Sequence, residues 1–112
     1  LSGDFIPVAH YAELLSRGAI IVALDANTNQ MLGALHQTQV RGVNWISHVA
    51  VKTEARGKRI GSGLVSRFLE NNRVDDKTRY MLWVQRQNEA AVKMYRQMGF
   101  KYMNKSTLSL IK

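Results

Sequence analysis

The chain has 112 residues, and its 16 Lys and Arg against 8 Asp and Glu leave a formal net charge of +8 at pH 7. This length fits one compact domain over residues 1–112, and the hydrophobic fraction of 46% argues for a folded protein rather than a disordered one. The sequence contains no cysteine, which excludes disulfides, thiolate metal sites and a cysteine nucleophile, and no apolar run approaches the length of a bilayer span. We therefore expect a soluble, cytoplasmic protein without membrane association, whose positive charge favours an anionic partner.

The N-terminal part is predicted to hold one helix and a β-hairpin. Pro7 can occupy a first helical position, and the apolar residues after it recur at helical spacing, so we predict a helix over 7–17. The runs "AIIVALD" (19–25) and "MLGALHQTQV" (31–40) are rich in residues that favour strands, and a polar turn separates them. These two runs are expected to pair as a hairpin.

Strands and helices alternate in the rest of the chain. Apolar residues between Ile60 and Leu69 share one helical face, and Asn88 can cap a later helix that Gly99 closes. The predicted elements are a strand over 43–51, a helix over 61–72, a strand over 79–85, a helix over 88–98 and one strand or a short strand pair in the tail, 101–112. Hairpin-spaced strands followed by strand–helix–strand crossovers predict an α/β fold (mixed α+β) with a mixed sheet and helices on its faces.

A basic, glycine-rich loop, "EARGKRIGSG" (54–63), joins the third strand to the first of these helices. Backbone N–H groups at a helix N-terminus bind phosphate, because the helix dipole is positive there and glycines let an anion approach the main chain. Three cations add charge around the turn: Arg56, Lys58 and Arg59. The alternative is a solvated loop without a ligand. The residue orders of a P-loop and of a dinucleotide-binding fold are both absent.

This loop and a second stretch together resemble the GNAT acyltransferase superfamily. Residues 56–61 are similar to the Q/R-x-x-G-x-G/A pattern of its acetyl-CoA pyrophosphate loop, although Arg59 stands where the first glycine is usual. The stretch "NEAAVKMYRQMGF" (88–100) matches the N-x-x-A-x-x-x-Y helix that ends in Gly-Phe. The resemblance implies a largely antiparallel central sheet with helices on both faces. Against that pattern, the N-terminal strand and helix are expected to be short or missing.

The resemblance implies an N-acetyltransferase that moves an acetyl group from acetyl-CoA to a primary amine by direct attack in a ternary complex. No metal is expected. The family splays the strands corresponding to 43–51 and 79–85 around the pantetheine arm, and the implied main-chain contacts are near Val49 and Val51. Tyr95 is the implied acid that protonates the leaving thiolate. The remaining implied cofactor-binding residues are Arg56, Gly57, Lys58, Arg59, Ile60, Gly61, Ser62 and Asn88.

Several of these residues also have purely structural interpretations. Tyr95 lies on the apolar face of its predicted helix and could belong to the core. Asn88 could be an ordinary helix cap. The general base is open: His48 is the candidate on the strand that supplies it in some relatives, but alternation groups it with Ile46 and Ala50. Weaker candidates are His36, Glu54 and a chain of water molecules.

Two other functions compete with the enzyme. The basic loop, with Trp45 and Trp83 available for stacking, would suit a nucleic-acid-binding domain, but this does not explain the second signature, so nucleic acid is not the expected partner. A catalytically inactive CoA-binding module is the third interpretation. The acceptor, a small molecule or a peptide, is not determined. The chain begins at Leu1 rather than Met, as a fragment would, and a missing first strand would open a sheet edge for a homodimer.

Overall fold

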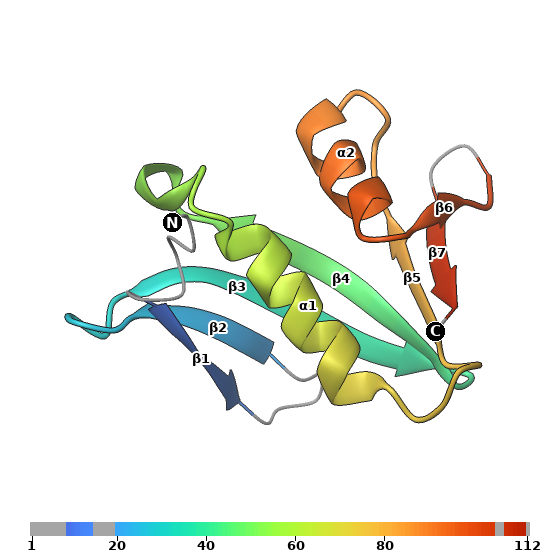
Figure 1. The fold of residues 1–112 in the computed structure, drawn as a ribbon, viewed down its shortest axis with the longest axis horizontal. Coiled ribbons are helices and arrows are strands. Elements are labelled where there is room, and N and C mark those ends of the chain that lie inside the picture. The colour runs from blue at the N-terminus through green and yellow to red at the C-terminus, as the bar shows by residue number, and fades with distance from the viewer. Residues whose placement is uncertain (1–8, 15–19, 105–106, 112) are drawn as a thin grey trace.

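The computed structural model describes residues 9–14, 20–104 and 107–111. In these residues the chain forms a seven-stranded sheet and two α-helices (Figure 1). The elements are β1 (Ala9–Leu14), β2 (Ile20–Asp25), β3 (Met31–Val40), β4 (Val43–Val51), a 3-10 turn (Thr53–Ala55), α1 (Ile60–Asn72), β5 (Arg79–Trp83), α2 (Glu89–Gln97), β6 (Lys101–Tyr102) and β7 (Thr107–Ile111). No helix in this part of the chain is long and apolar enough to cross a membrane.

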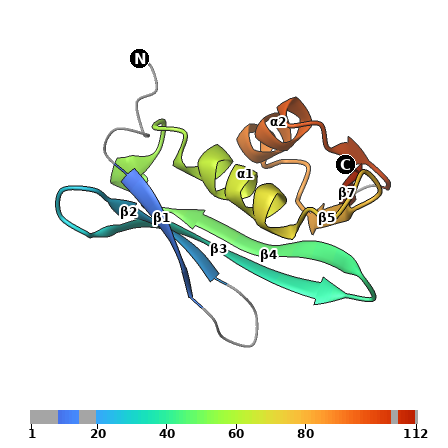
Figure 2. The ribbon, with the colours of Figure 1, turned by 60° about the horizontal axis from the view of Figure 1, so that its bottom comes forward.

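The strands follow the order β1-β2-β3-β4-β5-β7-β6. Only β4 and β5 are parallel, and every other neighbouring pair is antiparallel. The parallel pair arises because α1 connects β4 to β5 as a crossover. The predicted mixed, largely antiparallel sheet is therefore confirmed. In the described residues, however, α1 and α2 lie on the same face of the sheet rather than on both (Figure 2).

The predicted helix over 7–17 is wrong where the structure describes it. Residues Ala9–Leu14 form β1, which pairs antiparallel with β2 from Ala9 opposite Asp25 to Leu14 opposite Ile20. The other residues of that range lie outside the described part. A short apolar run fits either period, and pairing with the edge of β2 decides for a strand. Because β1 covers the edge of β2, the argument for a homodimer from an open β2 edge no longer holds.

The remaining elements agree with the predictions to within one or two residues at most ends. The hairpin of β2 and β3 is present, α1 begins at Ile60, and the tail forms the short strand pair β6 and β7. Asn88 caps α2, since its Oδ1 accepts a hydrogen bond from the Ala91 N–H at 3.4 Å. Gly99 follows α2 with a φ of +104°, a conformation that glycine adopts without strain.

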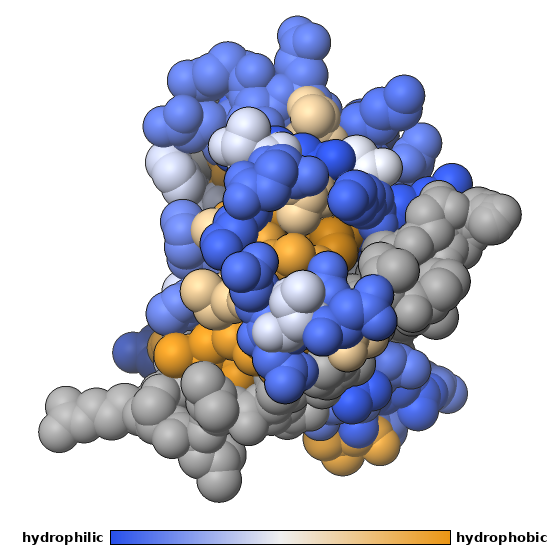
Figure 3. Space-filling view, turned by 90° about the vertical axis from the view of Figure 1, so that its left-hand side faces the viewer, coloured by the Kyte–Doolittle hydropathy of each residue, from blue (hydrophilic) through white to orange (hydrophobic). Residues whose placement is uncertain are grey.

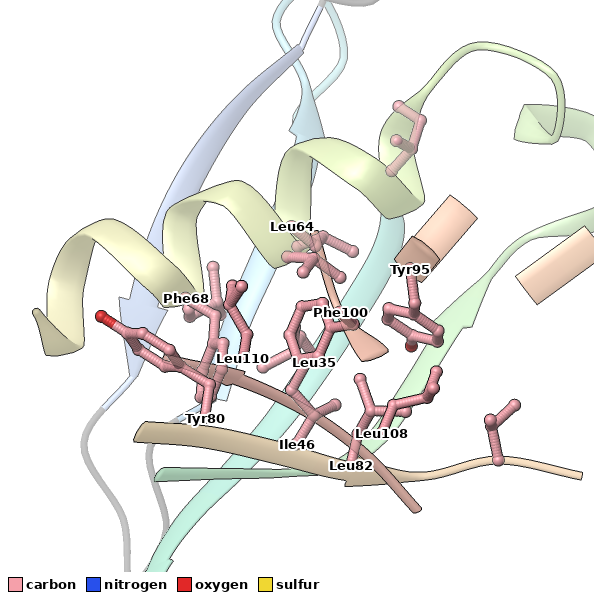
Figure 4. Packing of buried hydrophobic residues seen from close by; sticks show 14 of the residues in the cluster. Leu35, Ile46, Leu64, Phe68, Tyr80, Leu82, Tyr95, Phe100, Leu108 and Leu110 are labelled. Atoms are coloured by element: carbon pink, nitrogen blue, oxygen red, sulfur yellow. The ribbon is translucent and has the colours of Figure 1, made fainter. Parts of the chain in front are cut away.

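One core joins both helices to the sheet (Figure 4). The inner face of α1 is fully buried, because its apolar residues recur at helical spacing and pack on β2, β3 and β4. Phe68 of α1 meets Tyr80 of β5 edge-on with ring centroids 5.7 Å apart, and the Tyr80 hydroxyl donates to the Leu69 carbonyl at 3.2 Å. The core residues of α1 are Ile60, Leu64, Val65 and Phe68.

The parallel strands β4 and β5 are held together only at their starts. Paired residues run from Asn44 opposite Tyr80 to Ile46 opposite Leu82, after which the strands diverge (Figure 1). The buried side chain of Asn44 clamps the paired end, because its amide donates to the Arg79 carbonyl at 3.2 Å. The two strands therefore form a V that opens towards the N-terminus of α1.

A β-bulge at Ser47 reverses the alternation of β4 within this V. His36 of β3 faces His48 whereas Gln37 faces Ile46, so Ser47 has no partner on β3. Ile46 points to the face that carries the helices, and His48 points to the opposite face. The bulge thus separates a core-facing start of β4 from an end that lines the opening.

Candidate active site

A large cleft of about 1240 Å³ fills the V between β4 and β5. Its walls are the end of β4, the loop before α1, the first turn of α1, the end of β5 and one side of α2. Figure 3 shows the side that is on the left in Figure 1: its surface is mostly hydrophilic, and one group of hydrophobic atoms lies between hydrophilic residues near the centre. The cleft is lined by both polar and apolar side chains, as ligand pockets are.

The structure brings together all the site residues predicted from the sequence except one. Lys58 is exposed and does not line the cleft. The predicted residues that do line it are Tyr95, His48, Val49, Val51, Arg56, Gly57, Arg59, Ile60, Gly61, Ser62 and Asn88. Residues that the sequence analysis did not assign to the cofactor or catalysis also contribute, among them Trp83, Gln85 and Met94. The strand pattern of 79–85 could have indicated Trp83 and Gln85, because both follow the point where β5 leaves β4.

The first turn of α1 lies at one end of the cleft and has the features of a helix N-terminus that suits an anion. Arg59 is the N-cap residue, and its side chain makes no capping hydrogen bond to the first turn, which also holds no acidic residue. The N–H groups of a first turn have no partner within the helix, so here they remain available to a ligand. The Ser62 hydroxyl donates to the Arg59 carbonyl at 3.1 Å, so its proton is already used within the turn. Arg56 and Arg59 supply positive charge.

Arg59 adopts the left-handed conformation, with φ of 62° and ψ of 23°. A side chain in this region costs about 1–2 kcal/mol relative to glycine, because its Cβ approaches the following carbonyl. The loop therefore keeps the backbone that favours glycine at this position, and Arg59 carries the strain. Gly57 also has a positive φ, +80°, with nothing within 4 Å of where a Cβ would stand.

Gly61 forms part of the floor of the cleft. A Cβ at this position would lie 3.6 Å from the Met94 Sδ of α2 and 3.8 Å from a Val51 methyl of β4. These are ordinary contact distances, so a single methyl group would fit, whereas a branched side chain would fill the space between α1, β4 and α2. The absence of a side chain is what keeps this end of the cleft open.

Tyr95 belongs both to the core and to the cleft wall. Its side chain is 6% exposed, and its ring packs edge-on against Phe100 at 5.7 Å between centroids (Figure 4). In the part of the chain that the structure describes, no group forms a hydrogen bond with the Tyr95 hydroxyl. Burial disfavours the phenolate and raises the pKa of Tyr95 to about 12. At neutral pH the hydroxyl of this cleft-lining residue is therefore a protonated donor without a partner among the described residues.

His48 lies on the face of the sheet opposite the helices. The expectation that it shares a face with Ile46 and Ala50 is wrong for Ile46, because the bulge at Ser47 intervenes, and it holds for Ala50. The ring of His36 lies beside that of His48, with centroids 6.2 Å apart. His48 lines the cleft but His36 does not. Glu54, the other candidate, is exposed in the 3-10 turn and lies outside the lining.

Comparisons with known proteins point to one family. The family model described as an acetyltransferase (GNAT) domain matches residues 16–102. A search of curated proteins found no match. Among solved structures, a GCN5-related N-acetyltransferase from Kribbella flavida is 18% identical, with a TM-score of 0.76 over 88% of this chain and 70% of that one.

Two further structures share the fold. An N-acetyltransferase from Staphylococcus aureus Mu50 is 18% identical, with a TM-score of 0.74 over 84% of this chain and 67% of that one. A chain of the NatC complex, solved with a Gag peptide and CoA, is 23% identical, with a TM-score of 0.69 over 83% of this chain and 70% of that one. Because the family model covers most of the chain and the splayed sheet carries both signatures, this chain belongs to the GNAT family of acetyltransferases.

Proposed function

We propose that this chain is an N-acetyltransferase that takes its acetyl group from acetyl-CoA and passes it to a primary amine in a ternary complex. The observation that carries the proposal is the cleft between β4 and β5, which has a cationic helix N-terminus without a side-chain cap at one end and Tyr95 in its wall. A long ligand with a phosphate at one end and a reacting group at the other fits such a cleft. The acceptor is a small molecule or a peptide.

The residues present fit a CoA thioester. The N–H groups of the first turn of α1, with Arg56 and Arg59, would hold the pyrophosphate. In the described sheet, β4 has no strand partner on its β5 side beyond Ile46, so main-chain groups near Val49 and Val51 can pair with the amides of the pantetheine arm. The Oδ1 of Asn88 accepts the capping hydrogen bond, and the side-chain groups that this bond does not use would contact the cofactor. The open floor at Gly61 leaves room for the arm.

When bound, acetyl-CoA supplies a thioester whose carbonyl carbon the amine attacks. A main-chain N–H near Val49 would stabilise the negative charge that develops on the carbonyl oxygen. Tyr95 would donate its hydroxyl proton as the C–S bond breaks, so that the thiol leaves protonated. Its raised pKa keeps that proton in place at neutral pH.

The acceptor amine must lose a proton as its nitrogen bonds to the carbonyl carbon. His48 is the proposed base, because it lies at the end of β4 that lines the cleft and imidazole is the side chain that most often serves as a general base. A chain of water molecules is the alternative route. The Tyr95 hydroxyl and the His48 imidazole would then act on opposite sides of the reacting carbon, one as acid and the other as base.

The first test is isothermal titration calorimetry of the chain with acetyl-CoA and, in parallel, with a short single-stranded oligonucleotide. One-site binding of acetyl-CoA is expected, followed by thiol release when an amine is added. Arg56→Ala and Lys58→Ala remove the same charge from the same loop, but only Arg56 lines the cleft, so Arg56→Ala should weaken binding more.

Three other outcomes would count against the proposal. Binding of the oligonucleotide without acetyl-CoA binding would favour the nucleic-acid-binding domain. Acetyl-CoA binding without turnover for any amine would favour an inactive module. Equal effects of Arg56→Ala and Lys58→Ala would mean that bulk charge, and not the cleft, attracts the anion. The cytoplasmic location expected from the sequence stays a prediction.

A further inference from the structure

We infer that Trp83 is a specificity-determining residue for the acceptor, and that the acceptor is a primary amine with a flat aromatic body and few positive charges. The inference rests on the proposed function, since it assigns the second substrate of the same cleft. The indole ring of Trp83 is exposed. Trp83 is 61% exposed at the end of β5, yet it lines the cleft.

The registers place Trp83 and His48 on the same face of the sheet. Trp45 and Met81 are side by side in the parallel pair, so Trp83, two residues beyond Met81, shares their face. Thr38 pairs with Trp45 and His36 pairs with His48, and the alternation of β3 puts His36 and Thr38 on one face. The bulge at Ser47 is what brings His48 onto it.

Two rings therefore border the opening of the cleft on the face away from the helices. His48 stands on the β4 side and Trp83 on the β5 side, just beyond the point where the two strands part. The anion-binding loop lies elsewhere along the cleft, at the N-terminus of α1. An acceptor can thus enter between the two rings while the loop end is occupied by the donor.

The charge of the lining restricts what can enter. Among the described residues that line the cleft, none is an aspartate or a glutamate, and the charged side chains are Arg56 and Arg59. A polycationic acceptor would meet no carboxylate in this lining with which to pair its additional positive charges. An amine with one positive charge, which must be lost before attack, faces a much smaller penalty.

The chemistry of Trp83 indicates the body of the acceptor. An exposed indole offers a large planar surface that stacks on another flat ring, and it attracts a nearby ammonium group through its π face. Because Trp83 is not part of the buried core, its ring is free to serve a ligand rather than the fold. The same lining that disfavours polycations thus selects for a flat monoamine.

The test compares three amines at a fixed, saturating concentration of acetyl-CoA: 2-phenylethylamine, 2-cyclohexylethylamine and spermidine. The first two have the same chain and differ in the flatness of the ring, and the third is a polycation. Thiol release is expected to give the highest kcat/KM for 2-phenylethylamine and the lowest for spermidine. Calorimetry with acetyl-CoA accompanies every measurement.

Trp83→Ala is expected to raise the KM for 2-phenylethylamine about tenfold and to leave kcat within about twofold, since stacking and apolar contact are lost but the reacting groups are not. Trp83→Phe keeps a ring and should recover most of the loss. Val74→Ala removes an 84% exposed apolar side chain outside the cleft and is the matched control, expected to change nothing.

The outcomes separate the two proposals. A folded chain that does not bind acetyl-CoA refutes the acetyltransferase function, and this inference with it. A chain that binds acetyl-CoA but does not acetylate 2-phenylethylamine, or prefers spermidine, refutes the inference about the acceptor. An unchanged KM in Trp83→Ala, or a loss confined to kcat, removes Trp83 from acceptor recognition.

Discussion

Replacing Arg59 with glycine should stabilise the protein while weakening its donor binding. Arg59 has a φ of 62°, so glycine would relieve about 1–2 kcal/mol of backbone strain. Glycine also makes the unfolded chain more flexible, which costs about 0.4–1 kcal/mol. Taking the midpoints of the two ranges, the expected net gain in the free energy of unfolding is about 0.8 kcal/mol.

The same substitution removes a cation from the anion-binding end of the cleft. Arg59 is exposed, so the contact with a phosphate is partly screened by water, and we expect acetyl-CoA affinity to fall by up to about tenfold. Arg59→Ala is the control, because it removes the same charge but keeps a Cβ in the left-handed conformation. It should lose affinity to a similar extent and gain no stability.

Urea unfolding and calorimetry with acetyl-CoA measure the two effects separately. The quantity to compare is the difference in the free energy of unfolding between Arg59→Gly and Arg59→Ala. Both variants lose the same charge and nearly the same side-chain contacts, so these losses cancel to first order in the difference. If the two variants are equally stable, the loop does not hold position 59 in the left-handed conformation, and the account of the strained N-cap is wrong.

Three further predictions follow from the cleft and the core. Tyr95→Phe should lower kcat, measured by thiol release, by about 100-fold or more, because the proton donor is lost. The acetyl-CoA Kd, measured by calorimetry, should stay nearly unchanged. Equal losses of turnover and of acetyl-CoA affinity would rule out Tyr95 as the acid. Folding raises the pKa of Tyr95 from 10.0 to about 12, so the contribution of the protonated hydroxyl to stability is complete below pH 10 and is lost as the pH rises towards 12. Denaturation at successive pH values should therefore show a fall in the free energy of unfolding that the Tyr95→Phe variant lacks. Gly61→Val should weaken acetyl-CoA binding at least about tenfold in a folded protein, because its methyl groups would enter the space between Met94 and Val51, and unchanged affinity would mean that the arm runs elsewhere.

Local signals in the sequence were sufficient for α1 and α2, the helices on one side of the cleft. The helical spacing of Ile60, Leu64 and Phe68 predicted α1, and the polar side chain of Asn88 predicted the start of α2. Each of these signals depends on residues within one or two helical turns, so it can be recognised in a short stretch of sequence. The resemblance to the GNAT signatures rests on the same two local stretches.

The strand side of the cleft could not be predicted in this way, because contacts between distant strands decide it. Residues 9–14 are a strand only because β2 pairs with them, and their spacing alone suggested a helix. The face of His48 depends on a bulge that is defined by the register with β3, and the alternation of β4 alone pointed to the other face.

What the sequence by itself determined was the family, the order of most elements and the basic, glycine-rich loop before α1. What only the tertiary structure decided was where β4 and β5 part, which side of the sheet His48 and Trp83 share, and that Arg59 takes the conformation of a glycine. The physical reason is range: capping and helical periodicity are properties of consecutive residues, whereas strand register and the opening between strands arise only when remote segments pack together.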